Sequence, residues 1–129
     1  MNFRELPQNL LGKLIIKITK AECNLYDKNN TCFCYYLASR NFNKCWGVCL
    51  GEYIIVSYFN CNTLLHEWGH KQQSKKYGWL YLLIVGIPSI TRNIWDKIAH
   101  RKWAYERRYK WYYSAWPEKQ ADELGGVKR

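Results

Sequence analysis

Apolar residues recur at helical spacing near the start of the chain, at Leu10, Leu11, Leu14, Ile15 and Ile18. Residues three or four apart lie on one face of a helix, so this spacing predicts an amphipathic helix over residues 7–20. We expect its apolar stripe to pack on the core and its basic side to face solvent. The alternative is docking on a membrane surface through the basic residues of this segment, Arg4, Lys13, Lys17 and Lys20.

The pattern changes to that of β-strands between residues 23 and 59. Aromatic and β-branched residues fill segments 31–38, 45–50 and 53–59, and turn-forming residues occupy 27–30 and 40–43. These segments predict a small antiparallel sheet. Gly51 and Glu52 suit a tight connection between the last two strands, and Asn62 or Thr63 suits the N-cap of the helix that follows.

That helix is expected to run to about Tyr77, before Gly78. The apolar segment 79–90 follows it and is interrupted by Gly86 and Pro88. It is shorter than the roughly twenty residues that span a bilayer. We expect a buried helix packed behind the preceding one, and a segment that dips into a membrane is the alternative.

Residues 92–111 combine many basic side chains with interleaved tryptophan and tyrosine. Such a segment can stack on nucleic-acid bases or lie at a membrane interface. The simpler interpretation is an exposed helix whose charges are solvated and whose aromatic rings pack on the core. Neither of these two alternatives has a recognised motif in the segment, and nucleic acid is not the expected partner.

Length and composition indicate one compact domain over residues 1–129, and the helical and strand patterns above make its expected class α+β. The chain has 129 residues, of which 48% are hydrophobic, and a formal net charge of +10. That size suits a single core. The charge favours contact with anionic surfaces but specifies no chemistry.

Six cysteines lie at positions 23, 32, 34, 45, 49 and 61, and none forms a C-x-x-C pair. Lys13 and Lys17 interrupt the apolar residues near the start of the chain, so no secretion signal is indicated. We therefore expect a cytoplasmic protein with buried free thiols, with peripheral membrane association or disulfides as alternatives.

The chemistry centres on His66-Glu67-Trp68-Gly69-His70, an H-E-x-x-H pattern in the helix expected to end near Tyr77. His66 and His70 are four residues apart, so both imidazoles can reach one Zn²⁺. Glu67 is placed to act as the general base on a metal-activated water. Two histidines leave zinc short of a protein ligand, so a third is expected downstream.

Glu118 is the candidate for that third ligand. Pro117 suits the start of a short helix and Gly125 its end, so Glu118 and Asp122 would share one face. An Asp at this position can accept the other N–H of a ligand histidine and so fix its ring.

The combination of H-E-x-x-H with E-x-x-A-D resembles the gluzincin branch of the zincin metallopeptidases. It is similar in particular to peptidases related to the CaaX prenyl proteases, and to small uncharacterised bacterial proteins with a Gly-Gly-Val ending. The resemblance covers roughly the second half of the chain. It implies a minimal zincin-like domain in which His66, His70 and Glu118 bind zinc, Glu67 is the base and Asp122 supports a ligand. It also implies that a strand near the metal helix pairs with an extended substrate.

The larger gluzincins take an oxyanion donor from a segment that follows the third ligand. Here we expect His100, Tyr112 or Tyr113 to serve instead. The sequence thus predicts a zinc-dependent metallopeptidase that acts on peptides or proteins and binds anionic membranes weakly and in a salt-sensitive way. The alternatives are an inactive zinc-binding structural module and a basic protein that binds nucleic acid or membrane.

Overall fold

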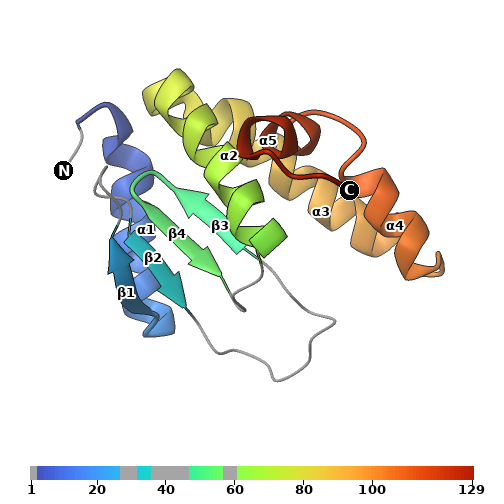
Figure 1. Cartoon of the computed structure of the whole chain (residues 1–129), viewed down its shortest axis with the longest axis horizontal. Helices are drawn as coiled ribbons and strands as arrows, with labels where there is room; N and C mark the ends of the chain where they lie inside the picture. Colours follow the sequence, from blue (N-terminus) through green and yellow to red (C-terminus); the bar gives the residue numbers. More distant parts are fainter. Residues whose placement is uncertain (1–2, 27–31, 36–46, 57–60) are drawn as a thin grey trace.

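The computed structural model describes residues 3–26, 32–35, 47–56 and 61–129. In this part of the chain a small sheet lies between helices, and a group of further helices lies beyond it (Figure 1). The expected α+β class is confirmed. The predicted turns at 27–30 and 40–43, and parts of the predicted strands, lie outside the described residues.

The helical elements are η1 (Phe3–Glu5), α1 (Leu6–Thr19), α2 (Cys61–Tyr77), η3 (Gly78–Leu80), the π-helical η4 (Leu82–Gly86), α3 (Ile87–Ala99), α4 (Tyr105–Tyr112) and α5 (Glu118–Gly125). The strands are β1 (Glu22–Tyr26), β2 (Cys32–Tyr35), β3 (Gly47–Leu50) and β4 (Tyr53–Val56). The end of α2 at Tyr77 agrees with the sequence. Its start at Cys61 does not, because Asn62 and Thr63 lie inside the first turn and are not caps.

The sheet has four strands in the order β1-β2-β4-β3. β1 and β2 are antiparallel, as are β3 and β4, and the latter pair is joined through Gly51 and Glu52 as predicted. The central pairing of β2 with β4 is parallel, which differs from the all-antiparallel expectation. The chain reaches the β3 edge first and then turns back, so β4 takes the place beside β2 and leaves β3 at the edge of the described sheet.

Helices cover both faces of β4. Ile54 and Val56 point towards α2, and Ile55 between them points towards α1, as the alternation of side chains along a strand requires. The α2 side is completed by Cys49, Leu64 and Trp68, and the α1 side by Ala21, Ile15, Ile16 and Val48. β4 is therefore the centre of the core, and α2 is held on it directly.

The bounds of α1 agree with the sequence, but the prediction that its whole apolar stripe packs on the core is wrong. Ile15 packs on the sheet, whereas Leu10, Leu14 and Ile18 are 54%, 52% and 70% exposed. The buried positions of this helix include the polar side chains of Gln8 and Asn9.

Specific hydrogen bonds hold these two amide side chains inside. The Gln8 amide donates to Ser74 Oγ at 3.1 Å and to the Gly78 carbonyl at 2.8 Å. Asn9 Oδ1 accepts from the Glu52 backbone N–H at 2.7 Å. Because these bonds connect α1 to α2, η3 and the β3–β4 turn, they decide which side of α1 faces inward.

Residues 79–90 do not form the expected buried helix. They contain η3, η4 and the start of α3, and only Tyr81 and Val85 among their large apolar residues are buried. Trp79, Leu83 and Ile90 are more than half exposed. One side of the segment packs on the domain and the other faces outward. No helix in the described ranges has both the length and the apolar character needed to cross a membrane.

The basic and aromatic residues of 92–111 lie on two helices, α3 and α4, and on the loop between them. Several rings pack within this segment. The Arg92 guanidinium lies 4.2 Å from the centre of the Trp111 ring, and Arg107 lies 3.8 Å from that of Trp103. These rings are therefore already engaged by the protein's own cations.

Candidate metal centre

Helices α2 and α5 approach each other with their backbones in contact, and two glycines permit it. A Cβ at Gly69 would lie 1.8 Å from the Ala121 carbonyl oxygen. A Cβ at Gly125 would lie 1.9 Å from the Leu65 carbonyl oxygen. Any side chain at these two positions would push the helices apart. This close approach brings the first turns of α5 over the histidines of α2.

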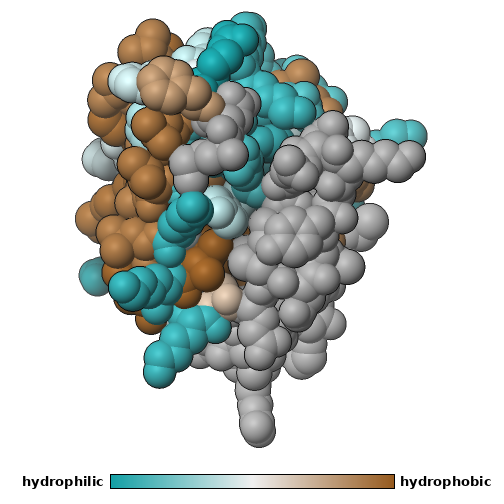
Figure 2. Space-filling view, turned by 90° about the vertical axis from the view of Figure 1, so that its left-hand side faces the viewer, coloured by the Kyte–Doolittle hydropathy of each residue, from teal (hydrophilic) through white to brown (hydrophobic). Residues whose placement is uncertain are grey.

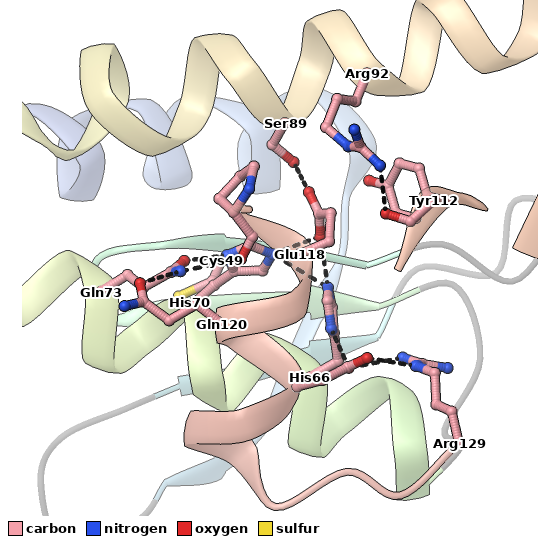
Figure 3. Close-up of polar contacts among 12 residues, drawn as sticks. Cys49, His66, His70, Gln73, Ser89, Arg92, Tyr112, Glu118, Gln120 and Arg129 are labelled. Atoms are coloured by element: carbon pink, nitrogen blue, oxygen red, sulfur yellow. Dashed lines mark hydrogen bonds and ion pairs between the residues drawn. The ribbon is translucent and has the colours of Figure 1, made fainter. Parts of the chain in front are cut away.

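The three residues expected to bind zinc converge at this contact (Figure 3). His66 Nε2 lies 2.8 Å and His70 Nε2 3.1 Å from the same oxygen, Glu118 Oε2. The two Nε2 atoms are 3.1 Å apart. All three side chains are buried. Residues that are 48 and 52 positions apart in sequence are thus brought to one point, as the sequence predicted.

Each histidine is oriented by an oxygen on its other ring nitrogen. His66 Nδ1 lies 2.7 Å from Asp122 Oδ1, and His70 Nδ1 lies 2.7 Å from Gln73 Oε1. The Gln73 amide is itself fixed, since its nitrogen donates to the Pro117 carbonyl and to Gln120 Oε1. Both Nδ1 atoms therefore face acceptors and carry a proton, so it is Nε2 of each ring that can offer its lone pair to a cation once it has lost its own proton.

Two lone pairs and one carboxylate oxygen then point at a common centre. Three acceptors this close repel one another unless a positive charge lies between them. Two imidazoles and a carboxylate with room for a fourth ligand are a donor set that catalytic zinc takes. The residues present fit a divalent cation.

The pKa values respond to the same crowding of acceptors. Burial by itself lowers the pKa of His66, but hydrogen bonds with Asp122 and Glu118 outweigh it and raise the pKa to about 9. His70 is also buried, and its bond with Glu118 raises its pKa. Burial opposes ionisation of Glu118, yet its bonds with the two histidines hold its pKa well below the usual range. The cluster attracts positive charge, whether as a proton or as a metal ion.

A second layer of polar contacts holds the ligands, and the sequence indicated only part of it. Asp122 was expected, but Gln73, Ser89 and Arg129 were not. Ser89 Oγ donates to the second oxygen of Glu118 (Figure 3). The Arg129 guanidinium donates to Asp122, with Nε 2.6 Å from Oδ2. Gln73 could have been found, because it lies three residues after His70 on the same helix. Ser89 and Arg129 come from other segments and carry no local signal.

Glu67 lies beside this cluster with one oxygen unengaged. The residue is 4% exposed, and its Oε2 has no hydrogen-bond partner within the described part of the chain. A buried carboxylate oxygen without a partner is costly, so its presence calls for an explanation. Burial raises the pKa of Glu67, although the two histidines counteract it. This direction moves a carboxylate towards the working range of a general base.

A cavity of about 410 Å³ opens onto the same group. His66, Glu67, His70 and Glu118 lie in its wall. The remaining wall is largely apolar and comes from α1, β3, η4 and α3, with Leu11, Leu82, Val85, Ile87 and Ile90 among its residues. The centre is therefore reached from outside through an apolar cavity.

Two of the three expected oxyanion donors line this cavity, namely Tyr112 and Tyr113. The Tyr113 ring meets the His66 ring edge-on at a centroid distance of 5.1 Å. Burial raises the pKa of both phenols, so they stay protonated and can donate a hydrogen bond at neutral pH.

The structure does not bring His100 to the site. His100 Nδ1 lies 3.1 Å from Asp96 Oδ1, its ring stacks on Trp103 at 3.6 Å, and it is absent from the cavity wall. The reason is topological. His100 follows the last turn of α3, more than two helical turns beyond Ser89, where its ring meets the Trp111 ring of α4 edge-on.

Comparison with known proteins adds no family assignment to this geometry. No protein-family model matches the chain, and neither does any curated protein or solved structure.

Proposed function

We propose that this protein is a zinc-dependent peptidase. One observation carries the proposal: three acceptors converge beside a buried Glu67 oxygen that has no hydrogen-bond partner among the described residues. A structural zinc site is usually closed by four protein ligands. Here three ligands, an adjacent carboxylate and an open cavity are the parts that a hydrolytic site requires.

His66, His70 and Glu118 would hold the metal. Zinc in such a site acts as a Lewis acid and makes water a stronger nucleophile at neutral pH. Glu67 accepts the proton of the attacking water and returns it to the departing amine. Tyr112 or Tyr113 donates a hydrogen bond to the oxygen of the scissile carbonyl as negative charge develops on it.

The surroundings suggest how a peptide would bind. β3 is the edge strand beside α2 in the described sheet, and Gly47, Val48, Cys49 and Leu50 all line the cavity. An edge strand offers backbone groups that can pair with an extended peptide. The apolar wall favours an apolar side chain next to the scissile bond.

The test is cleavage of a peptide library by wild-type protein and by Glu67→Gln, both loaded with zinc. Gln keeps the shape of the side chain but cannot accept the proton. We expect zinc content to stay unchanged and the cleavage rate to fall by about 10² to 10⁴-fold. Glu123→Gln, an exposed change on α5, is the matched control and should cleave like wild type.

Equal cleavage by wild-type and Glu67→Gln protein would exclude Glu67 as the base. Zinc binding without cleavage of any library member by the wild type would favour the inactive structural module. Absence of zinc binding would remove the metal proposal altogether and leave the basic surface as the remaining functional feature.

A further inference from the structure

Helices α1 and α3, together with η3 and η4, turn apolar side chains outward around the mouth of the cavity. We define the outer apolar face by its exposed residues, which are Leu10, Leu14 and Ile18 on α1 together with Trp79, Leu80, Leu83, Ile87, Ile90, Ile94 and Ile98 on η3, η4 and α3. Figure 2 shows apolar residues gathered along one side of the molecule, with hydrophilic side chains among them.

The residues of this face are continuous in the fold. Ile87, Ile90, Ile94 and Ile98 are spaced by three or four and so lie on one side of α3. α1 contacts η3, η3 contacts η4, and η4 contacts α3. Soluble monomers rarely expose apolar patches of more than a few hundred Å², and larger ones mark interaction sites.

The orientation of both helices makes this exposure specific. α1 buries Gln8 and Asn9 while its leucines face outward. α3 buries Asp96, which pairs with Arg108 Nη2 at 2.9 Å, while its isoleucines face outward. Each helix thus places a polar side chain inside, where it is hydrogen-bonded, and an apolar stripe outside.

Lysines lie among these apolar residues. Lys13 and Lys17 alternate with Leu10, Leu14 and Ile18 along the outside of α1, and all are exposed. Lys97 is exposed on α3 next to Ile94 and Ile98. None of the three lysines forms an ion pair with another described residue.

We propose that the outer apolar face docks on the surface of an anionic lipid bilayer. Lysine stems lie along apolar surface while their ammonium groups reach the headgroups, and tryptophan is favoured at the same depth. The net charge of +10 is complementary to such a surface. Protein interfaces are instead depleted of lysine, and pairing with a second copy would bring like charges together.

Docking would place the cavity mouth at the lipid surface. Leu11, Ile87 and Ile90 line the cavity and are also exposed, so the opening lies within or beside the outer apolar face. Provided that the proposed peptidase function holds, the substrate is then a peptide segment lying at the membrane surface.

Vesicle binding tests the docking without any reference to catalysis. The protein is sedimented with vesicles of phosphatidylcholine alone and of phosphatidylcholine mixed with an equal amount of phosphatidylglycerol. We expect binding to the anionic vesicles, weaker binding to the neutral ones, and partial retention of binding in high salt. Salt screens the lysines but leaves the apolar contribution intact.

Substitutions test whether the protein binds vesicles through the outer apolar face. Ile90→Ser with Ile94→Ser should weaken binding by about ten-fold or more, because serine removes most of the apolar surface that each exposed isoleucine would take out of water. Leu124→Ser, at an apolar residue on α5 that is 46% exposed, is the matched control and should bind like wild type. Lys13→Gln with Lys17→Gln should lose about five-fold per lysine, whereas Lys119→Gln with Lys128→Gln should lose less.

Equal binding by the isoleucine variant and wild type would overturn the assignment, as would absence of binding to anionic vesicles. A dimer in solution that dissociates in the isoleucine variant would assign the face to a second copy of the chain instead. Glu67→Gln should bind vesicles like wild type. Failure of docking and failure of the peptidase proposal are therefore separate results.

Discussion

Helices α2 and α3 distribute polar and apolar side chains in opposite ways. α2 buries six polar residues, which are His66, Glu67, His70, Lys71, Gln73 and Ser74. α3 buries Asp96 and exposes a row of isoleucines. Globular proteins normally bury isoleucine and expose lysine and glutamate, so each helix departs from the usual arrangement in its own way.

On α2 nearly every buried polar group is compensated by a partner. Lys71 Nζ lies 3.1 Å from Glu5 Oε2, and Ser74 Oγ donates to Glu5 Oε1 at 2.6 Å. Burial of charges is tolerated only with such pairing. Against this background the unengaged oxygen of Glu67 stands out, because the same helix satisfies its neighbours. This contrast distinguishes the polar residues of α2 that stabilise the fold from Glu67, whose unengaged oxygen suits a role as a general base.

On α3 the exposed isoleucines are left largely uncovered by the described part of the chain. Apolar side chains on the outside contribute little to the folded state, so their row along one face is explained better by a partner than by stability. Variants on the two helices should therefore differ in what they change.

The largest expected effect is loss of the metal. His66→Ala combined with Glu118→Ala removes two of the three converging acceptors, and zinc should no longer co-purify at a measurable level. His100→Ala is a matched control, since it removes a buried histidine outside the cavity wall and should leave zinc content unchanged. The measurement is metal content per chain after gel filtration. Zinc at the wild-type level in the double variant would show that the metal binds elsewhere.

An intermediate effect is expected from the residues that orient the ligands. Asp122→Ala and Gln73→Ala each leave one histidine Nδ1–H without its acceptor. Zinc affinity should fall by about 10 to 100-fold in each variant without being lost. Competition with a zinc-binding dye measures the affinity, and Glu123→Ala on the exposed side of α5 is the control. An unchanged affinity in both variants would limit Asp122 and Gln73 to structural roles.

The sequence predicted those parts of the structure that depend on local spacing. His66 and His70 lie on one turn of α2, and Asp122 follows Glu118 by one turn of α5, so both pairs follow from helical periodicity. The ends of α2 and α5 near Gly78 and Gly125 were also predicted from glycine as a helix terminator.

What the sequence did not predict depends on partners that are distant along the chain. Periodicity grouped the apolar residues of α1, but hydrogen bonds of Gln8 and Asn9 with η3, α2 and the β3–β4 turn decided which side faces inward. Likewise, no local pattern indicates that β4 pairs in parallel with β2, or that Ser89 reaches Glu118. The apolar character of segment 79–90 was read from the sequence. Which of its side chains face outward depends on the elements that pack against it, and the sequence did not predict that.

The smallest expected effect is on the free energy of unfolding when a residue of the outer apolar face is substituted. The vesicle experiment tests whether these residues bind lipid, and this one tests whether the fold needs them. Ile98 is 70% exposed on α3, so Ile98→Ala removes little buried surface and introduces a better helix former. The free energy of unfolding should change by less than about 0.5 kcal/mol in the absence of lipid. Ile54→Ala is the same substitution at a fully buried position of β4 and should cost about 2 to 5 kcal/mol. Urea unfolding of the two variants and wild type measures both values. A large loss of stability in Ile98→Ala would mean that the isoleucines of α3 pack inside the domain, and the face would then be part of the core instead of a surface for lipid.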